Sequence, residues 1–107
     1  LSDRVAMLRE TVALVSEMRV EDRLRARLHQ LADRFGVATR AGVELRLDLT
    51  HAQWASLVGA SREAVTTAFS KLRGNGAVEM EGRSITIPWD VVRAREEALA
   101  IAADRHL

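Results

Sequence analysis

The spacing of capping and turn residues between positions 50 and 73 constrains the fold more than any other feature of this sequence. Thr50 is followed three residues later by Gln53, a spacing typical of a capping box at the start of a helix. Gly59 is placed to end this helix, because glycine takes the left-handed conformation after a helix without steric cost. Ser61 can then cap a second helix. The segment is therefore expected to form two short helices joined by a tight turn.

The second helix has one apolar stripe, and the rest of its surface is polar. The stripe recurs at i, i+3, i+4 and i+7 and consists of Val65, Ala68, Phe69 and Leu72. The open faces carry Arg62, Glu63, Thr66, Thr67, Ser70 and Lys71. The run Gly74-Asn75-Gly76 ends the helix. Such a pair is typical of a helix-turn-helix, whose second helix fits the major groove of DNA. The alternative is an ordinary pair of antiparallel helices in a helical domain.

Residues 1–18 contain the seam of a coiled coil. Its apolar residues are spaced alternately four and three apart, and they are Leu1, Val5, Leu8, Val12 and Val15. Because two heptads are marginal alone, this helix is expected to need a partner, preferably the same helix of a second copy of the chain. Packing against the rest of its own chain is the alternative.

Residues 19–107 are expected to form one domain, which begins with a helix over residues 20–35. The apolar face of that helix carries Val20, Leu24, Leu28, Leu31 and Phe35. Gly36 is expected to end it as a left-handed glycine. Residues 43–49 alternate apolar and polar side chains, which predicts a half-buried strand that leads directly into the helix-turn-helix.

A hairpin over residues 77–87 and a helix over residues 89–104 are expected after the helix-turn-helix. Gly82 turns the hairpin, and its arms alternate through Val78, Met80, Ile85 and Ile87 up to Pro88. Asp90 is the expected N-cap of the helix, whose apolar side runs through Val91, Val92, Leu99 and Ala102. A hairpin directly after a helix-turn-helix is a wing. The expected fold class is therefore mainly α with a small β component: a winged helix-turn-helix preceded by part of a dimerisation helix.

The sequence offers little for enzyme chemistry. The chain has no cysteine, and His29, His51 and His106 lack the spacing of metal ligands. It also has no phosphate-binding glycine loop and no nucleophile elbow. We therefore expect no metal, no cofactor and no catalytic activity in this chain. An apolar run of membrane-spanning length and a signal peptide are both absent from the sequence, so the expected location is the cytoplasm.

The charged residues argue against a strongly basic coat for nucleic acid, because the net charge is only +1. Lys71 is nevertheless the one lysine among 16 basic residues. The planar fork of arginine suits guanine edges and phosphates better than the point charge of lysine does. A GC-rich genome, which favours arginine codons, is the alternative explanation.

Arg62 is the most informative exposed residue. It is expected at the first position of the second helix, where the helix dipole disfavours a cation by about 0.3–1 kcal/mol. Contact with the O6 and N7 atoms of guanine would explain an arginine there, whereas the alternative is a solvated side chain that points away. Glu63 suits the dipole and can also accept a hydrogen bond from cytosine N4. The predicted base contacts are Arg62, Glu63, Thr66 and Thr67.

Phosphate contacts are predicted at the helix starts and at the wing. The free backbone amides at the start of the first helix suit a phosphate group. At the wing, Glu79 and Glu81 would oppose such contacts. The predicted set is Thr50, His51, Gln53, Ser61, Ser70, Lys71, Arg83 and Ser84.

The run Leu57-Val58-Gly59-Ala60-Ser61-Arg62-Glu63-Ala64-Val65 closely resembles the recognition motif of the Crp/Fnr family, the cyclic-AMP receptor protein and fumarate–nitrate regulator family. Residues 22–36, 47–50 and 82–87 are similar to the family's first DNA-domain helix, its strand and its wing. The resemblance implies a transcriptional regulator that binds double-stranded DNA as a homodimer. It also implies that Arg62 and Glu63 recognise a G·C-containing half-site within a palindrome. RNA polymerase is a further candidate partner.

Departures from the family pattern limit what the resemblance implies. Thr67 stands where many members carry a second arginine, so the half-site is expected to differ from theirs. Leu8 and Arg9 stand near positions where cyclic-AMP-responsive members often carry hydroxyl groups. The family's sensory β-barrel would be missing, so the sequence identifies no effector. A winged helix used for protein–protein contact, suggested by the near-neutral charge, is the competing function.

Overall fold

Helices and short strands alternate along the part of the chain that the computed structural model describes, residues 19–105. The elements are α2 (Val20–Phe35), β1 (Val37–Ala38), β2 (Gly42–Leu45), α3 (His51–Val58), α4 (Arg62–Gly74), β3 (Glu79–Glu81), β4 (Ser84–Pro88) and α5 (Trp89–Arg105). This order confirms the expected fold class, mainly α with a small β component. The residues of the predicted coiled-coil seam, Leu1, Val5, Leu8, Val12 and Val15, lie outside the described residues.

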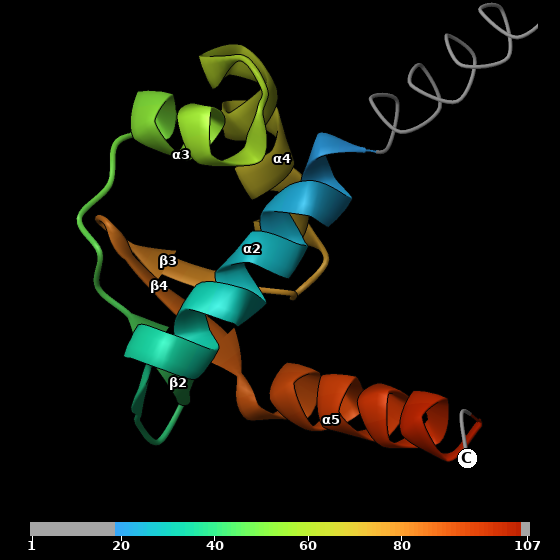
Figure 1. The fold of residues 1–107 in the computed structure, drawn as a ribbon. Helices are drawn as coiled ribbons and strands as arrows, with labels where there is room; N and C mark the ends of the chain where they lie inside the picture. Colours follow the sequence, from blue (N-terminus) through green and yellow to red (C-terminus); the bar gives the residue numbers. More distant parts are fainter. Residues whose placement is uncertain (1–18, 106–107) are drawn as a thin grey trace, which may run out of the picture.

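The strands form one antiparallel sheet in the order β1-β2-β4-β3. Val43 of β2 faces Ile87 of β4, and Met80 of β3 faces Ile85 of β4. Figure 1 shows α3 and α4 at one end of the molecule, the sheet beneath them, and α2 crossing diagonally between the two ends. α5 extends from the far end of the sheet. The helix-turn-helix is thus held by α2 and the sheet and lies away from α5.

The core joins α2, the helix-turn-helix and the sheet. Its fully buried side chains come from all three and are Leu24, Leu28, Leu45, Val65, Leu72 and Ile87. Trp54 of α3 is only 3% exposed and packs its edge against Phe69 of α4, with ring centroids 5.9 Å apart. The buried side of α4 is the predicted apolar stripe, so its opposite side is left for solvent or a ligand.

The predicted caps of the helix-turn-helix are confirmed. The Thr50 hydroxyl accepts a hydrogen bond from the Gln53 amide at 3.1 Å, and the Gln53 side chain accepts one from the Thr50 amide at 2.8 Å. Gly59 is left-handed, with φ 69°. Ser61 accepts from the Ala64 amide at 3.1 Å and caps α4. Local side-chain chemistry therefore fixes both helix starts and the turn between them.

The strand predicted over residues 43–49 is wrong at its C-terminal end. β2 ends at Leu45, and Asp48 has the left-handed φ of 54°, which no strand residue adopts. The apolar residues Leu47 and Leu49 still pack partly against the core. Burial therefore continues to alternate through an irregular loop after β2. For this reason the alternating sequence pattern predicted a longer strand than the one that forms. The two-residue strand β1 was not predicted, because two residues are too few for a recognisable pattern.

The expected left-handed conformation of Gly36 is also wrong. Gly36 ends α2 with an extended backbone, φ −71°. A Cβ atom at this position would collide with the Val43 side chain and with the carbonyl group of Ala32. The glycine is therefore required by the close approach of β2 to the end of α2.

The predicted apolar faces of α2 and α5 are only partly buried. Phe35, expected on the buried face of α2, is 54% exposed. In α5, Val91 and Val92 pack partly against the core, but Leu99 is 54% exposed and Ala102 is exposed as well. Leu99 and Ala102 are exposed because α5 runs beyond the sheet (Figure 1).

The start of α5 also differs from the expectation. The helix begins at Trp89, so Asp90 lies in its first turn rather than at the N-cap. The Trp89 indole donates a hydrogen bond to the Thr39 carbonyl at 2.8 Å, which ties the start of α5 to the loop between β1 and β2. None of the helices between residues 19 and 105 has the length and apolar character that a membrane-spanning helix needs.

Candidate nucleic-acid interface

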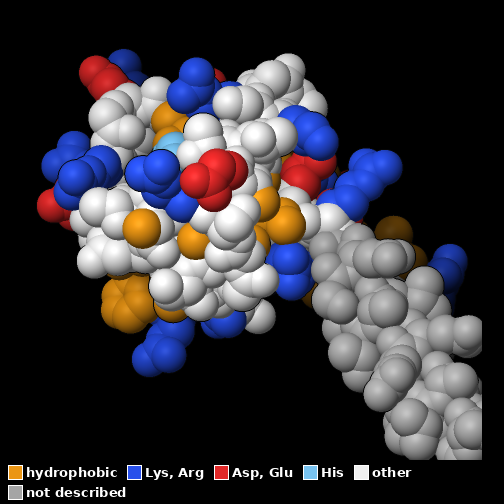
Figure 2. Space-filling view, turned by 90° about the horizontal axis from the view of Figure 1, so that it is seen from above, with side chains coloured by type: hydrophobic (Ala, Val, Ile, Leu, Met, Phe, Trp, Pro, Cys, Tyr) orange, Lys and Arg blue, Asp and Glu red, His pale blue; other side chains and the backbone are white. Residues whose placement is uncertain are grey.

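The outer side of α4 and the starts of α3 and α4 form one exposed surface. Seen from this end of the molecule, basic side chains are spread widely, with acidic side chains between them and hydrophobic ones in small separate patches (Figure 2). The exposed residues of α4 include Arg62, Glu63, Thr66, Thr67, Ser70 and Lys71, the set expected on its open faces. The helix therefore presents polar side chains along its length while its other side is anchored in the core.

Arg62 and Glu63 form the first turn of α4. Their side chains are 68% and 78% exposed, and the Arg62 Nη2 and Glu63 Oε1 atoms are 3.7 Å apart. An ion pair this exposed contributes little to stability, typically about 0–1 kcal/mol. Both groups can therefore exchange their mutual contact for a ligand at small cost.

Thr66 is placed differently from the other predicted base contacts. Its hydroxyl donates a hydrogen bond to the Arg62 carbonyl at 3.0 Å and lies 2.8 Å from Nδ1 of His51 on α3. His51 also stacks on Phe69, with ring centroids 5.2 Å apart. The hydroxyl of Thr66 therefore bonds within the helix-turn-helix, although Thr66 and the neighbouring Thr67 are both exposed.

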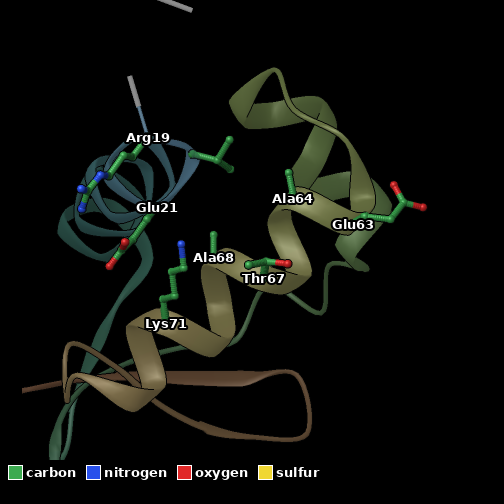
Figure 3. A pocket seen from close by; sticks show the side chains of 8 residues that line it. Arg19, Glu21, Glu63, Ala64, Thr67, Ala68 and Lys71 are labelled. Carbon is green, nitrogen blue, oxygen red and sulfur yellow. The ribbon is translucent and has the colours of Figure 1, made fainter. Parts of the chain in front are cut away.

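A groove separates α4 from the start of α2. It is lined by Arg19, Val20, Glu21, Glu63, Ala64, Thr67, Ala68 and Lys71. Figure 3 shows Lys71 reaching into the space between α4 and the start of α2, and Glu63 directed away from α2. Both residues therefore border the groove, but only the Lys71 side chain reaches across it toward α2.

The predicted phosphate contacts at the helix starts keep free donors. The hydroxyl oxygens of Thr50 and Ser61 accept hydrogen bonds as caps, so their hydrogen atoms can still be donated outward. Gln53 uses its carbonyl oxygen in the capping box, so its NH₂ group is left to donate. The caps therefore combine a structural role with the capacity to bind an anion.

The wing places its two predicted contacts in different surroundings. Gly82 turns it with φ 61°, and Arg83 beside it pairs with Asp48, with 3.1 Å between Nη1 and Oδ1. Ser84 instead donates to the Glu44 carboxylate at 3.0 Å within the sheet. Arg83 is thus displayed at the wing, whereas Ser84 is engaged by a neighbouring strand.

Asp48 and Glu44 were missed by sequence reasoning. Asp48 was assigned to a strand, and only its partner Arg83 and its left-handed backbone show its place beside the wing. Hydrogen bonds from Arg46 first, and then from Ser84, hold the pKa of the Glu44 carboxyl below its ordinary value of 4.5. No local sequence signal links Asp48 to Arg83 or Glu44 to Ser84, because each pair joins loops or strands that are distant in the chain.

The cleft between the wing and the helix-turn-helix has a volume of about 240 Å³. It is lined by Leu49, Thr50, His51, Trp54, Phe69, Met80, Gly82, Arg83 and Ile85. His51 and Arg83, both predicted phosphate contacts, line the same cleft although 32 positions separate them in the sequence. The fold therefore brings the wing and the start of α3 to one surface.

His29 lies outside this surface. It is buried on the side of α2 that lies near α5, and burial is the main cause that lowers its pKa from the ordinary value of 6.5, followed by the positive charge of Arg95. Within residues 19–105, the acidic and histidine side chains form no cluster of three or more suited to a metal ion.

The sequence model of the Crp-like helix-turn-helix domain matches residues 22–88. A CRP-like cAMP-activated global transcriptional regulator of Mycobacterium tuberculosis is 40% identical over 68 residues, which are 64% of this chain and 30% of that protein. Electron transport regulator A of Shewanella oneidensis is 28% identical over 87 residues, which are 81% of this chain and 35% of that protein. Both are named as regulators, and the chain spans about a third of their length.

Solved structures share the fold. A transcriptional regulator of the CRP/FNR family from Thermus thermophilus aligns with a TM-score of 0.63 and 24% identity over 89% of this chain and 48% of that one. A mutant of CooA from Carboxydothermus hydrogenoformans aligns with a TM-score of 0.65 and 22% identity over 89% of this chain and 44% of that one. At this identity the likeness establishes a common architecture.

Proposed function

This chain belongs to the Crp-like helix-turn-helix family, and on that premise we propose that it is a sequence-specific DNA-binding domain of a transcriptional regulator. The observation that carries the proposal is the first turn of α4. Arg62 and Glu63 are both largely exposed there, on a helix whose opposite side is locked into the core. Such a helix can enter the major groove without any change in the rest of the fold.

Arg62 and Glu63 are the proposed base-reading residues. The guanidinium group of Arg62 can donate two hydrogen bonds to guanine O6 and N7, and the Glu63 carboxylate can accept one from cytosine N4. Together they suit a G·C-containing half-site. Thr67, on the same helix, is proposed to contact a base with its shorter side chain. Thr66 is proposed to contact a base with its methyl group, because its hydroxyl is already bonded to the Arg62 carbonyl.

The remaining predicted donors, of which His51 and Ser84 are half-buried, are proposed to bind phosphates. They lie at the helix starts, along α4 and at the wing, and comprise Thr50, His51, Gln53, Ser61, Ser70, Lys71, Arg83 and Ser84. Ser84 must release Glu44 before it can do so, whereas Arg83 keeps N–H groups that its contact with Asp48 does not use. These contacts would set the position of the domain on the duplex, while the bases supply sequence preference.

The assembly is proposed to be a homodimer on a palindromic site. Residues 1–18 would form the C-terminal part of a dimerisation helix, and residues 19–107 the winged helix-turn-helix. Two copies would place two α4 helices in successive major grooves of one DNA face, as dimeric regulators do. RNA polymerase is a candidate partner of the bound dimer, and the location proposed is the cytoplasm.

A protein–protein interaction module is the second candidate. The exposed apolar side chains Phe35, Val37, Leu99 and Ile101 favour it, because they lie away from α4 and offer surface to another protein. The net charge of +1 points the same way.

Selection of bound duplexes from a random pool, followed by a salt titration, tests the proposal. A DNA-binding domain should enrich a half-site, in two copies at a fixed spacing for the dimer. Its affinity should fall steeply with salt in proportion to the phosphates that it contacts. If no duplex is enriched and binding is insensitive to salt, the interaction module is the better explanation.

A further inference from the structure

The contact between His51 and Thr66 links the two helices of the helix-turn-helix through one ring nitrogen. Nδ1 of His51 lies 2.8 Å from the Thr66 hydroxyl oxygen, and that hydroxyl lies 3.0 Å from the Arg62 carbonyl oxygen. The stack of His51 on Phe69 fixes the plane of the ring. The residue that begins α3 is therefore bonded to the first turn of α4, where the proposed base contacts lie.

The two contacts of Thr66 decide which ring nitrogen carries the hydrogen. A hydroxyl has a single hydrogen atom, and the Arg62 carbonyl can only accept. If Nδ1 of His51 carries a hydrogen, both contacts are hydrogen bonds. If it does not, the hydroxyl hydrogen can satisfy one contact only. The arrangement therefore favours the neutral tautomer with its hydrogen on Nδ1 and a lone pair on Nε2.

A phosphate contact imposes the opposite demand on the same ring. The structure gives Nε2 no hydrogen-bond partner among residues 19–105, so this atom is the one left for a ligand. A lone pair on Nε2 repels a phosphate oxygen, whereas an N–H group donates to it. Both ring nitrogens can be donors at once only in the protonated ring.

We propose that His51 is a positioning residue that holds Thr66 through Nδ1 and a DNA phosphate through Nε2, so that the domain takes up one proton at His51 when it binds DNA. This inference rests on the proposed DNA-binding function. It makes His51 the link between the backbone contact at α3 and the placement of Arg62, because Thr66 bonds both.

Charged groups around the ring set the background for this proton. From the wing, Arg83 lines the same cleft as His51 and is paired with Asp48 from the loop before α3. From α4, the charged residues in the turn bonded to Thr66 are Arg62 and Glu63, which pair with each other. Each nearby cation is thus paired with a carboxylate that offsets its charge. A bound phosphate adds a negative charge that is not offset, and this charge favours the protonated ring.

The test measures affinity for the duplex recovered by selection from a random pool, between pH 8 and pH 6. For the wild-type chain the affinity should rise as the pH falls, by up to about tenfold per pH unit, the limit for one linked proton. His51→Gln should bind with no such rise, because the glutamine amide donates without titrating. Calorimetry in buffers of different ionisation enthalpy should find net proton uptake by the wild type on DNA binding and none by His51→Gln.

Two variants of Thr66 separate the proposal from a merely structural role of His51. Thr66→Ser keeps the hydroxyl and should keep the pH dependence. Thr66→Val removes the hydroxyl and frees Nδ1, so the neutral ring can put its hydrogen on Nε2 and the pH dependence should flatten while DNA is still bound. A thermal melt of each variant checks that it is folded. The calorimetry on the wild type tests the inference even if a variant does not fold.

Equal pH dependence in the wild type and His51→Gln, or no proton uptake by the wild type, would overturn the inference and leave the proposed function standing. A wild-type chain that binds no duplex at any pH would overturn both.

Discussion

At the scale of single residues, Arg62 combines an unfavourable position with a free side chain. It stands at the positive end of the α4 dipole, and the one charged partner near its guanidinium group within the described part of the chain is Glu63, which is more exposed still. Neither the fold nor the helix gains from a cation there. The proposed guanine contact would account for an arginine at this position.

Replacing Arg62 with alanine should therefore weaken binding to the selected duplex by about 1–3 kcal/mol and relax the preference at one base pair. Arg93→Ala, which removes an exposed arginine of α5 on the far side of the sheet, is the matched control and should change little. Fluorescence anisotropy on selected and random duplexes measures both. An equal loss on the two duplexes would contradict a base-reading role for Arg62.

Asp48 is the residue that pairs with Arg83 at the wing. Its carboxylate lies 3.1 Å from Nη1 of the Arg83 guanidinium group, so it neutralises the charge of Arg83 and competes with a phosphate for one of its N–H groups. Asp48→Asn removes the charge, and asparagine tolerates the left-handed backbone of this position. Since an exposed pair is worth about 0.2–1 kcal/mol, affinity should rise by up to about fivefold, on selected and random duplexes alike. Arg83→Gln in the same background should cancel the gain, and a gain that survives it would rule out this competition.

At the scale of elements, the junction between α2 and β2 depends on the absence of one side chain. Gly36→Ala should destabilise the fold by about 1–3 kcal/mol, because the new methyl group meets Val43 and the Ala32 carbonyl. Gly74 at the end of α4 is the matched control: a Cβ there meets nothing within 4 Å, so Gly74→Ala should be neutral or stabilising by up to about 1 kcal/mol. Urea unfolding measures both. Similar losses in the two variants would show that helix ends, and not this contact, govern the effect.

The stability of the fold should respond to pH through His29, which lies on the side of α2 near Arg95 of α5. Burial first, and Arg95 second, lower its pKa in the folded chain below 6.5. As the pH falls below about 6.5, the unfolded chain binds a proton that the folded chain still excludes, so the free energy of unfolding falls; above that pH the effect vanishes. Urea unfolding between pH 8 and pH 5.5 should show this loss in the wild type and a smaller one in His29→Gln. Parallel losses in the two proteins would assign the effect to other groups.

The elements also show what local sequence can predict. Caps such as those of Thr50 and Ser61 act within four residues, so their spacing predicted both helices of the helix-turn-helix. β2 instead ends at Leu45, and in the loop after it the left-handed Asp48 contacts Arg83, 35 residues away. Alternation in the sequence reports burial, and burial continues into the loop after β2. The exposure of Leu99 was unpredictable for a related reason: an apolar face in a sequence does not say what covers it.

The candidate site also has features that the sequence could predict and features that it could not. The exposure of Arg62 follows from the helix period, because the core side of α4 is fixed by its apolar stripe. The bond from Thr66 to His51 and the bond from Ser84 to Glu44 join separate elements, and residue type alone gave no sign of either. Position on a helix was thus predictable, whereas the partners of each side chain needed the fold.

At the scale of the whole molecule, the proposed dimer depends on residues 1–18. The double substitution Leu8→Asp, Val12→Asp puts charges into the predicted seam, and Ala6→Asp, off the seam, is its control. On a duplex with two half-sites the double variant should bind about 10²-fold more weakly, because the second domain is no longer tethered to the first. On a single half-site it should bind as the wild type does. Equal weakening on both duplexes would contradict dimerisation through this seam.

The two tryptophans of the chain occupy different parts of the molecule, and this makes the unlabelled protein its own optical reporter. Trp54 lies in the core of the helix-turn-helix beside Phe69, whereas Trp89 joins the sheet to α5 through the Thr39 carbonyl. Phenylalanine at either position would leave one emitter, which follows one end of the fold. Stopped-flow fluorescence on the two single-tryptophan chains could then time the loosening of α5 separately from the opening of the DNA-facing end.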